Sequence, residues 1–171
     1  METNSSQHLV LKPIMYELGT AVYLCQLFEN NLLLLISLLS SNSDNIVTAE
    51  SFESATFKYS EKTLGQIAKV FREKLSLPGN FEQFIREGVE ARNDLTHGFV
   101  MRNHDKFLTV DGRERIISEL RESQHLINDR LQSVQLILNK ALQVFGGSLE
   151  ELREKQEFHF EPEGENHTAK H

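Results

Sequence analysis

The stretch IISELRESQHLINDRLQSVQLILNKALQVF, residues 116–145, predicts one long helix whose partner decides the fold. Its seam recurs in steps of four and three, which alternate from Leu120 onward as in a heptad repeat. The seam consists of Ile116, Leu120, Gln124, Ile127, Leu131, Val134, Leu138, Ala141 and Phe145. The glycines at 146 and 147 are typical of a helix end. A helix of this length spans about 45 Å, so its seam needs a comparably long helix to pack against.

The segment from Pro13 to Ser40 is the one other stretch long enough to be that partner. Its apolar residues recur at spacings of three and four, and they are Ile14, Leu18, Ala21, Val22, Cys25, Phe28, Leu32, Leu35, Ile36 and Leu39. The second half is apolar on almost every side, which favours burial by the core, with a second subunit as a further candidate cover. Its uninterrupted apolar run, Leu32 to Leu39, is far shorter than the ~20 residues that a bilayer requires. We therefore expect a buried helix and no membrane contact.

Two further segments follow the first helix. Residues 42–59 are polar and irregular, and they predict a loop with a short helix near 49–57. A second clear helix is predicted over 64–75, with Ser60 as its candidate N-cap and Pro78–Gly79 after its end.

A third helix is predicted to begin at Asn80, as its cap, and to end at His97–Gly98, because glycine commonly follows the last helical turn. The turn-like pairs in residues 99–112 predict a connection to the long helix. With four main helices, the sequence predicts an all-α fold in the form of an up-and-down antiparallel helical bundle.

The composition agrees with one soluble helical domain. The chain has 171 residues, of which 39% are hydrophobic and 25% charged, with three prolines and no tryptophan. We expect residues 1–10 to be a polar flexible leader and residues 11–146 to form the bundle. Residues 147–171 are expected to be a short charged helix followed by a disordered acidic tail, because they hold too little apolar surface to fold.

Cysteine, histidine and charge narrow the classes of function. The lone Cys25 excludes an internal disulfide and a cysteine-based zinc site, and fits a reducing, cytoplasmic location. The histidines lack metal-ligand spacing and there is no glycine-rich phosphate loop, so we expect no metal and no cofactor. The formal net charge is −7, so any nucleic acid must meet a local positive site.

The segment Arg92-Asn93-Asp94-Leu95-Thr96-His97-Gly98-Phe99 carries the candidate chemistry. On an α-helix, Asn93 and His97 lie four residues apart and share one face. Arg92 and His97 lie five residues apart, which sets them about 140° around the helix axis from each other. One regular helix therefore does not easily direct both side chains at the same substrate atom, whereas two helices could.

The arginine followed by asparagine, with a histidine five residues after the arginine, resembles the signature of the HEPN superfamily. Thr63-Leu64-Gly65-Gln66 and Glu90-Ala91-Arg92-Asn93 add to a resemblance with bacterial HEPN-like proteins that spans Leu11 to Phe145. The resemblance implies an HEPN-like bundle and a homodimer in which the two protomers form one cleft. It further implies metal-independent cleavage of RNA in a phage-defence or toxin–antitoxin setting, with an antitoxin or a nucleotidyltransferase as candidate partner.

In such a site Arg92 and His97 would be catalytic. Histidine titrates near neutral pH and can move the proton of a ribose 2′-hydroxyl, and arginine can stabilise negative charge that develops on the phosphate. Asn93 would orient His97 or bind phosphate, and Glu29, with Asn30 and Asn31, would line the cleft from the first helix and tune His97.

Two other interpretations stay open. HEPN-like chains can be noncatalytic, so the alternative function is a helical interaction module that binds a partner protein or a nucleotide. In the structural interpretation, Arg92 and Asp94 are solvated surface residues and His97 caps the end of its helix. Whether the chain is an enzyme is therefore not decided by the sequence.

Overall fold

The computed structural model describes residues 3–41, 47–74 and 79–144. Within these ranges every regular element is helical and none is a strand, which confirms the all-α prediction. The predicted glycine stop at 146–147, the charged helix and the acidic tail lie outside the described residues. The elements are α1 (Thr3–Ser41), α2 (Ala49–Ser60), α3 (Leu64–Lys74), α4 (Gly79–Asn93), the π-helical turn η1 (Asp94–Gly98), α5 (Phe99–Asn103), the 3₁₀ turn η2 (His104–Leu108) and α6 (Val110–Val144).

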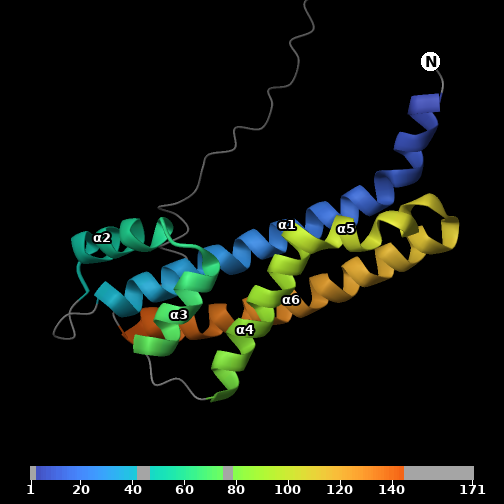
Figure 1. Cartoon of the computed structure of the whole chain (residues 1–171). Helices are drawn as coiled ribbons and strands as arrows, with labels where there is room; N and C mark the ends of the chain where they lie inside the picture. Colours follow the sequence, from blue (N-terminus) through green and yellow to red (C-terminus); the bar gives the residue numbers. More distant parts are fainter. Residues whose placement is uncertain (1–2, 42–46, 75–78, 145–171) are drawn as a thin grey trace, which may run out of the picture.

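Among the described elements, the two long helices, α1 and α6, form the most extensive helix pair, which confirms the predicted partnership. The predicted seam of α6 is largely buried, at Ile116, Leu120, Ile127, Leu131, Val134 and Leu138, and Leu142 joins it. Figure 1 shows that α1 and α6 run in the same direction, whereas an up-and-down order would make the first and last helices antiparallel. The reason is that α4 and α5 return the chain to the N-terminal half of α1, where α6 then begins.

α1 is longer than predicted. It begins at Thr3, so residues 3–10, expected as a flexible leader, belong to the helix, and Pro13 lies inside it. The apolar periodicity predicted a helix only from Pro13 onward, and proline is common in a first helical turn. Inside a helix, proline removes one backbone hydrogen bond and bends the helix rather than always ending it. Accordingly, the first turns of α1 tilt away from the remainder in Figure 1.

The second half of α1 is buried on more than one side, as predicted. Leu32, Leu34, Leu35, Ile36 and Leu38 are each at most 5% exposed, and α1 contacts α2 and α3 as well as α6. By length and mean hydropathy, the stretch Val10–Ser41 would suffice to cross a membrane, and half of its apolar 18-residue window is buried inside this structure.

Hydroxyl side chains cap α2 and α3. Thr48 and Ser51 form a reciprocal capping box at the start of α2. At the start of α3, the Thr63 amide donates to Gln66 Oε1, and the Gln66 amide donates to Thr63 Oγ1. The predicted cap, Ser60, is instead the last residue of α2, because that helix extends three residues beyond its predicted end.

The predicted stop at Gly98 and the predicted connection over 99–112 are both wrong, because these residues are largely helical. Gly98 keeps right-handed dihedral angles, φ −110° and ψ −30°, so it does not end the helix. Gly112 lies in the first turn of α6, where an added Cβ would be 2.7 Å from Thr109 Oγ1 and 2.8 Å from the carbonyl carbon of Lys106. Gly112 therefore allows η2 to pack closely against α6.

Candidate functional site

The candidate site is built on the π-helical turn η1, between α4 and α5. The Phe99 amide donates to the carbonyl oxygen of Asp94, five residues earlier, instead of closing an α-helical bond four residues back. Such a turn holds one more residue than an α turn, so residues five apart move toward the same side of the helix. Single π turns inside α-helices are rare and frequently lie at functional sites.

The turn brings Arg92 and His97 together within one chain. Arg92 Nη1 lies 3.5 Å from His97 Nε2 and donates to Asn93 Oδ1 at 3.1 Å. The predicted separation of 140° assumed a regular α-helix and does not hold here, because the backbone widens between the two residues. A second chain is therefore not needed to bring arginine and histidine side by side.

The three side chains differ in their access to solvent. His97 and Asn93 are exposed, and the Arg92 side chain is 24% exposed. The Thr96 hydroxyl donates to the Arg92 carbonyl oxygen at 2.9 Å, at the point where the backbone changes from α to π. Among the described residues, Nη2 of Arg92 has no hydrogen-bond partner. This nitrogen could therefore donate a hydrogen bond to a phosphate group, with His97 beside it.

Glu29 is the residue of α1 that reaches this cluster. Its carboxylate Oε1 forms an ion pair with Arg92 Nε, so the four predicted site residues lie in one group. Glu29 contacts the arginine, whereas the sequence suggested that it would act on His97. The pair is partly buried, with the Glu29 side chain 31% exposed.

The approach of α4 to α1 is set by Gly88, one turn before Arg92, and by Phe28, one residue before Glu29. A Cβ added to Gly88 would lie 2.5 Å from Cζ of Phe28, whose side chain is fully buried. Gly88 thus lets α4 cross α1 over the Phe28 ring. Arg92 follows Gly88 by one turn and Glu29 follows Phe28 directly, so this crossing places the two charged groups together.

The neighbouring asparagines of α1 lie in different environments. Asn31 is buried, and its Nδ2 donates to the Leu27 carbonyl oxygen at 2.8 Å, so it does not line the site as predicted. Asn30 is exposed. Together with Glu29 it lines an open hollow of about 300 Å³ between α1, α2 and α3, whose other lining residues are Gln26, Leu33, Tyr59, Ser60, Lys62, Leu64 and Ile67.

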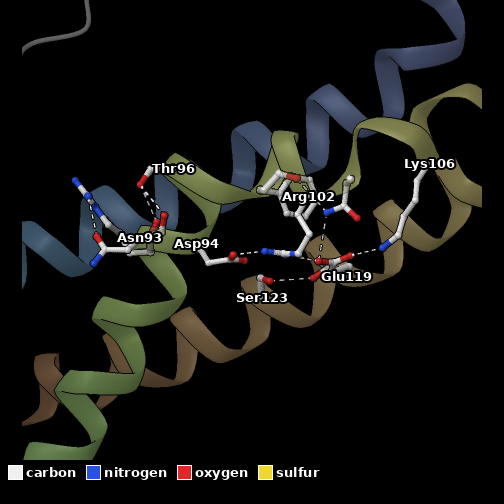
Figure 2. Close-up of polar contacts among 10 residues, drawn as sticks. Asn93, Asp94, Thr96, Arg102, Lys106, Glu119 and Ser123 are labelled. Carbon is white, nitrogen blue, oxygen red and sulfur yellow. Dashed lines mark hydrogen bonds and ion pairs between the residues drawn. The ribbon is translucent and has the colours of Figure 1, made fainter.

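A second polar cluster, which the motif did not indicate, lies on the other side of the π turn (Figure 2). Arg102 of α5 forms ion pairs with Asp94 of η1 through Nη1 and with Glu119 of α6 through Nη2. Lys106 Nζ lies 3.3 Å from Glu119 Oε2, and Asn103 Nδ2 lies 3.4 Å from Glu119 Oε1. Glu119 lies on a different helix and at least 13 residues from the other members in sequence, so no spacing pattern could have grouped them.

The electrostatics of this cluster follow from its pairing. Burial opposes ionisation of Glu119, but the hydrogen bonds from Arg102, Asn103 and Lys106 together outweigh it, so the pKa of this carboxyl lies below its ordinary value. Asp94 and then Glu119 raise the pKa of Arg102 above its ordinary value. Glu119 and Arg102 therefore both stay ionised across the physiological pH range.

Within the described ranges, no group of three or more His, Cys, Asp or Glu side chains is placed so that it could bind a metal ion. Cys25 is buried, and burial, followed by the nearby charge of Glu29, raises the pKa of its thiol to about 11. Its burial agrees with its place in the apolar pattern of residues 13–40. Comparison of the chain with family models, with curated proteins and with solved structures returned no match.

Proposed function

We propose that this chain is a metal-independent endoribonuclease of the HEPN type that acts as a homodimer. The observation that carries the proposal is the placement of the Arg92 guanidinium 3.5 Å from the His97 imidazole, on an exposed π turn. The residue order Arg-Asn-x-x-x-His supports it. Cleavage of a phosphodiester needs a permanent cation to stabilise the charge on the phosphate. It also needs a side chain of a type that exchanges protons near neutral pH, such as histidine.

Each residue has a defined task in the proposed reaction. His97 Nε2 takes the proton of a ribose 2′-hydroxyl while its oxygen attacks the adjacent phosphorus. The bond from phosphorus to the 5′ oxygen breaks and a 2′,3′-cyclic phosphate forms. The departing 5′ oxygen takes a proton from a water molecule, and His97 returns its own proton to the hydroxide that this leaves. Arg92 stabilises the added negative charge on the nonbridging oxygens, and Asn93 holds the guanidinium in place. The substrate is RNA because the nucleophile is the 2′-hydroxyl.

The homodimer in this proposal rests on charge. The chain carries a formal net charge of −7, which opposes the approach of RNA. Two copies of Arg92 in one cleft would focus a positive field there. Such a cleft would be the place where an antitoxin or a nucleotidyltransferase partner could control access, in a cytoplasmic setting.

The test is cleavage of single-stranded RNA by the purified chain in the presence of a chelator. We expect the wild type to release fragments with 2′,3′-cyclic phosphate ends, and His97→Ala to be slower by about 100-fold or more, the usual contribution of a general acid or base. Arg92→Ala should lose activity as well. The matched control is His125→Ala, since His125 is an exposed histidine on a different helix, α6.

Two results would contradict the proposal. The first is equal cleavage by the wild type and His97→Ala, which would point to a contaminating nuclease. The second is no cleavage by the wild type on any RNA tested, or cleavage that the chelator abolishes.

A noncatalytic module that binds a partner protein or a nucleotide is the second candidate. The ion pair between Arg92 and Glu29 favours it, because the carboxylate neutralises the cation that a phosphate would otherwise meet. This candidate predicts that the wild type does not cleave RNA and that Glu29→Gln, which removes the competing charge, does not create activity. Under the ribonuclease proposal Glu29→Gln keeps the activity.

A further inference from the structure

Arg102 connects the π turn to the long helix α6. Its guanidinium contacts the carboxylate of Asp94, the first residue of η1, and the carboxylate of Glu119, which lies in α6 (Figure 2). Arg102 also lies over the Phe99 ring, with its Cζ 5.8 Å from the ring centroid. One planar side chain therefore bridges two carboxylates from different elements, a geometry that the arginine fork suits.

Asp94 takes part in the π turn twice. Its backbone carbonyl accepts the hydrogen bond from the Phe99 amide that defines the turn, and its side chain is held by Arg102. Movement of the Asp94 side chain would therefore also displace the carbonyl group that accepts the π-helical hydrogen bond.

Gly98 makes room for this arrangement. A Cβ added at Gly98 would lie 3.1 Å from Asp94 Oδ1 and 3.9 Å from Arg102 Nη1. The backbone of Gly98 is right-handed, so its conformation alone does not require glycine. The space that glycine leaves is occupied by the ion pair, which explains why this position holds a glycine although the helix does not end there.

We propose that Arg102 is a positioning residue, which holds Asp94 against α6 and thereby keeps the π turn that sets His97 beside Arg92. The catalytic part of this inference rests on the proposed ribonuclease function, whereas its structural part does not. Arg102 does not touch the phosphate site itself. Lysine cannot replace it, because one ammonium on a flexible stem does not span both carboxylates in a fixed geometry.

The expected effect is local. The side chains of Arg102, Asp94 and Glu119 are 46%, 41% and 29% exposed, and ion pairs with this much solvent contact add little to global stability. Removing Arg102 should therefore leave the bundle folded while the π turn loosens. A shift of the order of 1 Å in a catalytic group is enough to slow a reaction by about 100-fold.

The experiment compares Arg102→Met and Arg102→Lys with Arg121→Met. Arg121 is a matched control, since it also lies at the bundle surface and forms an ion pair that joins α6 to another helix, through Glu17. Amide hydrogen exchange is measured on the full chain by NMR. We expect protection of the Phe99 amide to fall by about tenfold or more in both Arg102 variants, while that of Leu131 in α6 and the circular dichroism spectrum stay unchanged. Arg121→Met should leave Phe99 protected.

The rate of RNA cleavage is the second measurement. We expect kcat to fall by about 100-fold in Arg102→Met with a smaller change in KM, and no such loss in Arg121→Met. Unchanged protection of the Phe99 amide in Arg102→Met would overturn the inference, as would an equal loss of kcat in Arg121→Met. A loosened π turn in a chain whose wild type cleaves no RNA would leave the structural part standing and defeat the ribonuclease proposal alone.

Discussion

At the scale of single residues, the sequence indicated most of the candidate site. The close contact of Gly88 with Phe28 explains where in the fold the site lies. The residues Arg92, Asn93, His97 and Glu29 lie together as expected, although Glu29 contacts the arginine rather than the histidine. Gly88 was not singled out, because its role depends on the Phe28 ring sixty residues earlier. A glycine inside a predicted helix gives no sign of which side chain will pack against it.

Gly88→Ala should show how much the crossing of α4 and α1 depends on this glycine. The added methyl would overlap the buried Phe28 ring, and overpacking of this kind costs about 1–3 kcal/mol. We expect the free energy of unfolding, measured by denaturant titration, to fall by that amount. The matched control is Gly19→Ala in α1, where an added Cβ meets nothing within 4 Å.

In that open helical position, alanine should raise stability by about 0.5–1 kcal/mol. A stabilising effect of Gly88→Ala would show that the two helices can separate without cost. The placement of Arg92 beside Glu29 would then need another explanation.

At the scale of helices, a polar residue in the seam of α6 has a partner in α1. Gln124 interrupts the apolar heptad pattern, and its Nε2 donates to the backbone carbonyl of Glu17 at 2.8 Å and to Glu17 Oε2 at 2.9 Å. Arg121 Nη2 lies 2.7 Å from Glu17 Oε1. Glu17 is 9% exposed, so slippage of α1 along α6 would leave its carboxylate buried without partners, which is costly. This cluster therefore fixes the register of the two helices.

The cluster predicts how stability depends on pH. The hydrogen bond from Gln124, followed by that from Arg121, holds the pKa of Glu17 below its ordinary value of 4.5. A lowered pKa in the folded state stabilises the fold above the ordinary pKa, and that stabilisation is lost as the pH falls below it. Glu17→Gln should reduce the free energy of unfolding by about 1 kcal/mol at pH 7, with a smaller difference from wild type at pH 3.

The measurement is denaturant unfolding of both chains across this pH range. Glu53→Gln is the control, because Glu53 is an exposed carboxylate on α2. A difference between Glu17→Gln and wild type that is independent of pH would show that the carboxylate charge does not contribute.

At the scale of the whole molecule, the structure changes the argument for a homodimer. A regular α-helix would require two chains to place arginine beside histidine, whereas the π turn places them together in one chain. The remaining argument is the net charge of −7, which a cleft with two Arg92 side chains would offset locally. The functional unit expected from the structure is thus an arginine and a histidine of the same chain.

Mixing Arg92→Ala chains with His97→Ala chains tests this expectation. If each reaction uses both residues of one chain, a mixed dimer has no complete pair and should stay inactive toward RNA. Co-expression of the two variants under different tags, with purification by both tags, gives the mixed dimer. A mixed dimer that recovers cleavage would show that the arginine of one protomer serves the histidine of the other.

The sequence by itself determined the helical class, the pairing of the two long helices and the residues of the candidate site. These depend on periodicity and motif, which are local properties of the chain. Only the tertiary structure decided that α6 runs parallel to α1, that the helix passes Gly98 through a π turn, and that Arg102 joins Asp94 to Glu119. The physical reason is that each of these depends on contacts between distant side chains, whose free energies compete with local helix preference and leave no trace in residue spacing.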